Sequence, residues 1–151
     1  MKKINLDITI NAPREKVWDA IVSDAKYRGW AAAFMEGSFF EGGWNKGDSI
    51  QFLVVNQNGK KEGMISEIAE SIYPEFISIQ HLGFILDGVE DRTSDAVKAW
   101  VPSFENYSFE KINEHTTKFS VDMDIEDQHH VNFTELWGKA LQKLKAIAEA
   151  K

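Results

Sequence analysis

One long amphipathic helix closes this sequence, and it follows a run of strand-like segments. Its apolar residues recur at helical spacing between about residue 127 and residue 150 and form one broad stripe: Phe133, Leu136, Trp137, Ala140, Leu141, Leu144, Ile147 and Ala148. Consecutive antiparallel strands form a sheet whose apolar face must be covered. Since no other predicted helix is long enough, the sequence predicts an α+β fold with a curved antiparallel sheet wrapped around the C-terminal helix.

One strand and two short helices precede the main run of strands. Apolar and polar residues alternate strictly over residues 4–10, which is typical of a half-buried strand. Pro13 ends this strand and suits a first helical turn, where its missing N–H is not needed. The apolar spacing from Val17 to Val22 predicts a first helix, and a second is predicted over about residues 23–30.

About six strands are predicted between residue 34 and residue 125. They cover Phe39–Glu41, Ile50–Val55, Met64–Ile72, Phe76–Leu86, a segment around Tyr107 and Phe109, and Phe119–Ile125. Phe76–Leu86 carries apolar residues at both odd and even positions, so we expect this strand to be covered on both faces.

A polar insertion, Asp87–Ser103, interrupts the strands. Ser94 is a candidate N-cap for a helical fragment that starts at Asp95. Trp100 is the large aromatic residue of this segment. We expect it either to fold over a cavity mouth or to present an exposed aromatic contact, a residue type common at interaction hot spots.

Composition excludes several classes of function. The absence of cysteine removes disulfides, thiolate metal sites and cysteine nucleophiles. A formal charge of −7 opposes binding to nucleic acid or anionic membranes. Neighbouring His129 and His130 point about 100° apart on a helix and do not form a chelating pair. With no secretory signal and no membrane-spanning run, we expect one cytoplasmic domain over residues 1–151, without a metal, a cofactor or membrane insertion.

Several stretches, taken in order, resemble the START-like (SRPBCC, helix-grip) superfamily. Within it the chain is most similar to the branch of activator of Hsp90 ATPase homologues and polyketide-cyclase-like proteins. The resemblance rests on residues 8–13 with Val17 and Trp18, residues 40–44 with Gly47 and Asp48, residues 63–65, residues 74–79, and Trp137, Leu141 and Leu144. It covers nearly the whole chain and implies a helix-grip fold with a cavity between the sheet and the long helix.

Eight residues are candidates for the lining of such a cavity. They are Trp30, Phe52, His81, Phe84, Trp100, Tyr107, Phe133 and Trp137. Aromatic side chains are typical of apolar pockets, and His81 and Tyr107 have polar atoms to orient a ligand. Ordinary core packing is the alternative, because ten Phe and five Trp could fill the space themselves.

The leading hypothesis is a module that binds a small apolar or lipid-like molecule. No residue is assigned a catalytic role. One alternative is acid–base chemistry of the cyclase, hydrolase or dehydratase type, for which His81 and Tyr107 are the inward-facing candidates. Another is a stress-response protein that contacts a chaperone through Trp100. The sequence leaves the identity of the ligand and the oligomeric state open.

Overall fold

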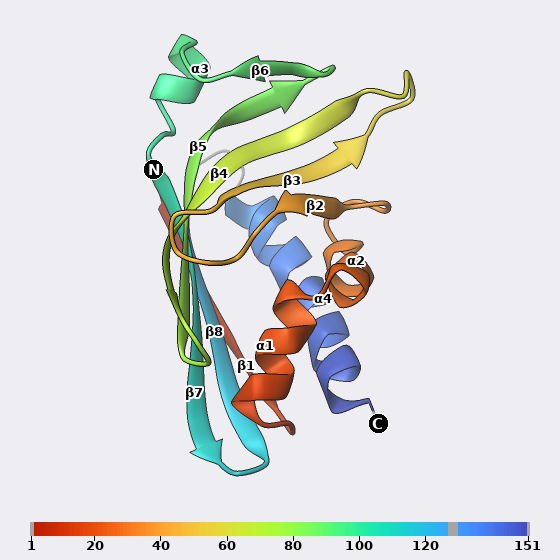
Figure 1. The fold of residues 1–151 in the computed structure, drawn as a ribbon, viewed down its shortest axis with the longest axis vertical. Coiled ribbons are helices and arrows are strands. Elements are labelled where there is room, and N and C mark those ends of the chain that lie inside the picture. The colour runs from red at the N-terminus through yellow and green to blue at the C-terminus, as the bar shows by residue number, and fades with distance from the viewer. Residues whose placement is uncertain (1, 127–129, 151) are drawn as a thin grey trace.

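The fold is built on an antiparallel sheet of eight strands. The computed structural model describes residues 2–126 and 130–150. The spatial order is β1-β8-β7-β5-β4-β3-β2, and the short β6 pairs with β5. The strand bounds are β1 Lys2–Ile10, β2 Phe39–Gly42, β3 Ser49–Val55, β4 Lys61–Ile72, β5 Phe76–Leu86, β6 Val89–Asp91, β7 Ser103–Asn113 and β8 Thr116–Ile125. The sheet is strongly curved, and α1, α2 and α4 lie on the same side of it (Figure 1).

The strand β1 shows how the sequence pattern fixes the fold locally. It pairs with β8 along its whole length, from Lys2 opposite Ile125 to Ile10 opposite Thr117. Ile4 and Ile10 are fully buried, whereas the polar residues between the isoleucines and leucine are exposed. The alternation therefore places one face of β1 on the core, as predicted.

Two short helices follow β1, as predicted. The first, α1, spans Arg14–Val22, and the second, α2, spans Asp24–Ala31. Pro13 occupies the position before α1, and its carbonyl accepts the first helical hydrogen bonds. Both helices bury apolar side chains under the sheet, and Trp30 of α2 is only 2% exposed.

The long helix α4, His130–Glu149, covers the concave face of the sheet. Its apolar stripe packs against β1 and α2 and joins the main core. At its C-terminal end, Glu149 accepts hydrogen bonds from the Lys145 ammonium and from the Asn11 amide, which lies just beyond β1. The predicted start near residue 127 and His129 fall outside the described residues.

The polar insertion contains one more strand than the sequence analysis predicted. Leu86 pairs with Val89, so Asp87 and Gly88 form a two-residue hairpin turn, and both have positive φ. The helix α3, Asp95–Lys98, follows, and the Ser94 hydroxyl accepts a hydrogen bond from the Val97 amide, as predicted for an N-cap. In Figure 1, α3 and β6 lie at one end of the molecule, apart from the other helices.

The expectation that Trp100 is an exposed aromatic contact is wrong. Its side chain is 4% exposed. The indole stacks on the ring of Phe84, with centroids 4.7 Å apart, and on the ring of His81 at 5.3 Å. The insertion therefore uses Trp100 to attach itself to β5, and this ring offers no surface for a chaperone.

Candidate functional site

A cavity of about 260 Å³ lies between the sheet and the helices α2 and α4. Strands β3, β4, β7 and β8 contribute its other wall. The aromatic residues that line it are Tyr27, Trp30, Phe34, Phe52, Tyr107, Phe133 and Trp137, and three methionines, Met35, Met64 and Met123, join them. Met35 and Asn132 are exposed as well as part of the lining, so the cavity reaches the surface between α2 and α4.

The aromatic wall is held in place by contacts between rings and by indole hydrogen bonds. Trp137 of α4 stacks on Trp30 at 5.9 Å between centroids and meets Phe34 edge-on at 5.0 Å. The Trp30 indole N–H donates to the Ala20 carbonyl at 3.0 Å, and that of Trp137 donates to the sulfur of Met123 at 3.1 Å. Because both N–H groups are satisfied within the protein, the two indoles present their apolar rings to the cavity.

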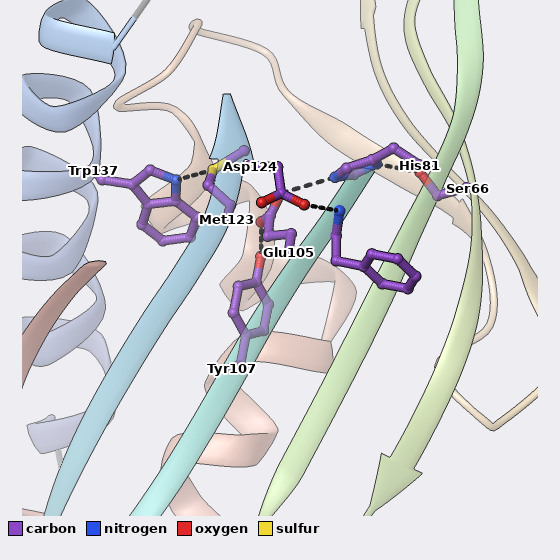
Figure 2. A network of polar contacts seen from close by, with 8 residues as sticks. Ser66, His81, Glu105, Tyr107, Met123, Asp124 and Trp137 are labelled. Atoms are coloured by element: carbon purple, nitrogen blue, oxygen red, sulfur yellow. Dashed lines mark hydrogen bonds and ion pairs between the residues drawn. The ribbon is translucent and has the colours of Figure 1, made fainter. Parts of the chain in front are cut away.

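Glu105 brings a carboxyl group to this mainly apolar wall. It lies in β7 two residues before Tyr107, so both side chains point to the same face of the sheet. Its Oε1 lies 3.0 Å from His81 Nε2, and its Oε2 accepts a hydrogen bond from the Tyr107 hydroxyl (Figure 2). The Glu105 side chain is 10% exposed. Oε2 is therefore an acceptor, and Oε1 lies within hydrogen-bond distance of the imidazole.

His81 supports Glu105 from outside the cavity. The imidazole is fully buried in β5 and does not line the cavity. Its Nδ1 lies 2.7 Å from the hydroxyl of Ser66 in β4 (Figure 2). Since a carboxylate only accepts, the network assigns a proton to Nε2, which donates to Glu105. The chain Ser66–His81–Glu105–Tyr107 thus holds the carboxyl group in one orientation.

Two buried tyrosines line the cavity together with Glu105. Burial raises the pKa of the Tyr107 hydroxyl well above its ordinary value, and the negative charge of Glu105 adds to this effect. Burial also raises the pKa of Tyr27 strongly, again with a contribution from Glu105. Unlike that of Tyr107, the Tyr27 hydroxyl has no hydrogen-bond partner among the described residues. Both side chains are neutral at physiological pH and act as hydrogen-bonding groups.

The structure brings five of the eight predicted cavity residues together around the cavity: Trp30, Phe52, Tyr107, Phe133 and Trp137. The other three form a separate stack. His81 and Phe84 of β5 each stack on Trp100, and none of these three rings lines the cavity. Whether the five surround a bound ligand stays a prediction.

Sequence reasoning missed the two polar groups that matter most here. Glu105 alternates with Ser103, Tyr107 and Phe109, so it occupies a buried position on the inward face of β7. An acidic residue in such a pattern is a signal that could have been read from the sequence. Tyr27 lies three and four residues before Trp30 and Ala31, the buried residues of α2, which is the helical spacing of a shared face.

The described residues contain no group of three or more His, Asp or Glu arranged to hold a metal ion. His129 lies outside them, and the side chain of His130 is not described. None of the described helices is long and apolar enough to cross a membrane.

Comparison with known proteins agrees with this architecture. The family model described as Activator of Hsp90 ATPase homolog 1-like protein matches residues 11–149. The chain belongs to this family. A search of curated proteins found no match. The resemblance inferred from the sequence motifs, and the helix-grip fold that it implied, are therefore confirmed for this member of the Activator of Hsp90 ATPase homolog 1-like family.

Solved structures share the fold over almost the whole chain. The Aha1 dimer from Colwellia psychrerythraea is 18% identical, with a TM-score of 0.71 and coverage of 99% of this chain and 97% of that one. A protein from Chromobacterium violaceum is also 18% identical, with a TM-score of 0.70 and complete coverage of both chains. A protein from Mycobacterium smegmatis is 14% identical, with a TM-score of 0.71 over 99% and 91%. At these identities the likeness shows the fold alone.

Proposed function

We propose that this protein binds a small, mainly apolar molecule in the cavity between the sheet and α4. The observation that carries the proposal is the cavity of about 260 Å³ with its aromatic and methionine lining. An engineered apolar cavity of about 150 Å³ holds one benzene molecule, so the present volume suits roughly ten non-hydrogen atoms. Burial of such a molecule is favourable because it removes apolar surface from water.

Binding is better supported than acid–base turnover. The enzyme hypothesis relied on His81 and Tyr107 as groups that face a substrate. His81 lies outside the cavity, and its ring is occupied by Ser66 and Glu105. The Tyr107 hydroxyl is held by Glu105, and its raised pKa makes it a poor proton donor. These side chains support the wall rather than a reaction.

A titration with propylbenzene tests the proposal. The quenching or enhancement of tryptophan fluorescence reports binding, because Trp30 and Trp137 line the cavity. For a ligand with nine non-hydrogen atoms we expect a Kd on the order of 10⁻⁴ M. Native mass spectrometry of the purified protein, before and after denaturation, checks in parallel for a molecule that co-purifies.

A cavity-filling variant supplies the structural control. Ala31 is 1% exposed and lines the cavity at the end of α2, so Ala31→Leu should fill part of the space and abolish propylbenzene binding. Ala25→Leu makes the same change at an exposed position of the same helix and should bind like the wild type. If Ala31→Leu does not fold, Leu136→Phe in α4 fills the space from the other side. Unchanged affinity in a folded filling variant would place the binding elsewhere and refute the proposal.

A further inference from the structure

We infer that the ligand ends in a hydrogen-bond donor, an amine or a hydroxyl group bound by Glu105 and Tyr27, and that the cavity rejects acids. This inference rests on the proposed function and adds to it the chemical class of the ligand. It predicts an apolar body among the aromatic rings and one polar end at the carboxyl group of β7.

The carboxyl group of Glu105 has capacity for a further donor. Each carboxylate oxygen accepts about two hydrogen bonds, and the protein supplies one to each: His81 to Oε1 and Tyr107 to Oε2. The remaining acceptor sites belong to a side chain that lines the cavity. The network behind Glu105 fixes its orientation, so a ligand donor meets a group that is already in place.

The Tyr27 hydroxyl is the second polar group at this end. Tyr27 is 7% exposed and lines the cavity, and its hydroxyl is without a partner among the described residues. A hydroxyl both donates and accepts, so at the cavity wall it can form a hydrogen bond with a ligand amine or hydroxyl. Tyr27 and Glu105 both line the cavity, so both polar groups are available to one ligand bound there.

The charges around the cavity exclude an acidic ligand end. The described residues that line the cavity include two glutamates, Glu62 and Glu105, and no lysine, arginine or histidine. A carboxylate or phosphate would lose its water and gain no cation in return, while Glu105 would repel it. Fatty acids and phosphorylated ligands are therefore the wrong class.

Four probes with one common skeleton test the inference: 3-phenylpropylamine, 3-phenylpropanol, propylbenzene and 3-phenylpropanoate. At pH 7 we expect the amine to bind at least tenfold more tightly than the carboxylate, a ratio typical of one hydrogen bond to a charged group. The alcohol should bind more tightly than propylbenzene. Equal affinities of the amine and the carboxylate would overturn the inference.

Two variants assign the effect to the named groups. Glu105→Gln should reduce the preference for amine over carboxylate to within about threefold. Glu110→Gln makes the same change at an exposed position of the same strand and should keep the wild-type preference. If Glu105→Gln does not fold, Tyr27→Phe keeps the carboxylate and should weaken the alcohol without weakening propylbenzene.

The outcomes separate the inference from the proposed function. If propylbenzene binds and the amine binds no better, the apolar cavity stands and the assignment of a donor fails. If none of the four probes binds, the proposed function fails and the inference fails with it. A preference for the amine that survives Glu105→Gln in a folded protein would also overturn the role of Glu105.

Discussion

The two cavity tyrosines differ in one respect that a stability measurement can isolate. The Tyr107 hydroxyl donates to Glu105, whereas the Tyr27 hydroxyl has no partner among the described residues. Replacement of either tyrosine by phenylalanine removes one oxygen and leaves the ring. The ring of Tyr107 then keeps its contacts with Phe119 and Trp137, at 5.6 and 5.9 Å between centroids. No apolar cavity is created, so the change in stability reports the hydrogen bond itself.

The expected magnitudes follow from the geometry. A hydrogen bond to a charged group contributes about 1.5–3 kcal/mol, and the loss leaves Glu105 Oε2 without a protein donor. Because Glu105 lines the cavity, water has access to this oxygen and offsets part of the loss. We therefore expect Tyr107→Phe to lower the free energy of unfolding by about 1–2 kcal/mol. Tyr27→Phe should change it by less than about 0.5 kcal/mol.

Urea unfolding followed by tryptophan fluorescence measures this difference. With a typical urea dependence of about 1–3 kcal/mol per M, the midpoint of Tyr107→Phe should fall by roughly 0.5–1 M at an unchanged slope. The midpoint of Tyr27→Phe should stay near that of the wild type. Equal midpoints for the two variants would show that Glu105 gains nothing from the Tyr107 hydroxyl, and the network drawn in Figure 2 would then be wrong.

Three further predictions concern other parts of the fold. A Cβ at Gly138 of α4 meets nothing within 4 Å, so Gly138→Ala should stabilise the helix by about 0.5–1 kcal/mol and raise Tm by a few degrees in calorimetry. The hydrogen bond from Lys145, with that from the Asn11 amide, lowers the pKa of Glu149. The folding stability that ionised Glu149 contributes is therefore present above about pH 4.3 and is lost as the pH falls through the lowered pKa. Glu149→Gln should therefore lower the free energy of unfolding in urea by up to about 1 kcal/mol at pH 7 and leave it unchanged near pH 2. A difference between variant and wild type that persists at pH 2 would contradict the assignment. Trp100→Ala should lower the free energy of unfolding by about 3–5 kcal/mol in the same assay. It should leave propylbenzene affinity unchanged in the folded protein, because the indole lies outside the cavity.

Local patterns in the sequence were enough to predict most of the fold. The alternation in β1 follows from the two-residue period of a strand, and the apolar stripe of α4 follows from the 3.6-residue period of a helix. The order of elements then left few ways to cover the sheet. The missed strand β6 was also a local feature, because Asp87-Gly88 is a typical two-residue hairpin turn. The polar composition of the insertion predicts a loop with a helical fragment, whereas this turn signal predicts the hairpin that the structure shows.

The site was less predictable because it depends on which distant strands become neighbours. His81 was expected to face a ligand, but the pairing of β5 with β4 and β7 places it between Ser66 and Glu105. Between Ile65 and Ser66 the register of β4 on β5 shifts, which no periodicity reveals. Trp100 reaches β5 from a separate segment, so its burial also depended on tertiary contacts.

The methionine lining has a chemical consequence for the cavity. Of the four methionines in the sequence, Met35, Met64 and Met123 line it, and their exposure is graded: Met35 is 58% exposed, Met64 is half-buried and Met123 is 3% exposed. Thioethers are flexible and polarizable, so this wall adapts to ligands of different shape. Oxidants convert a thioether into a polar sulfoxide. Peroxide should therefore oxidise Met35 first. Subsequent oxidation of Met64 and Met123 would make the cavity wall polar and weaken the binding of apolar molecules.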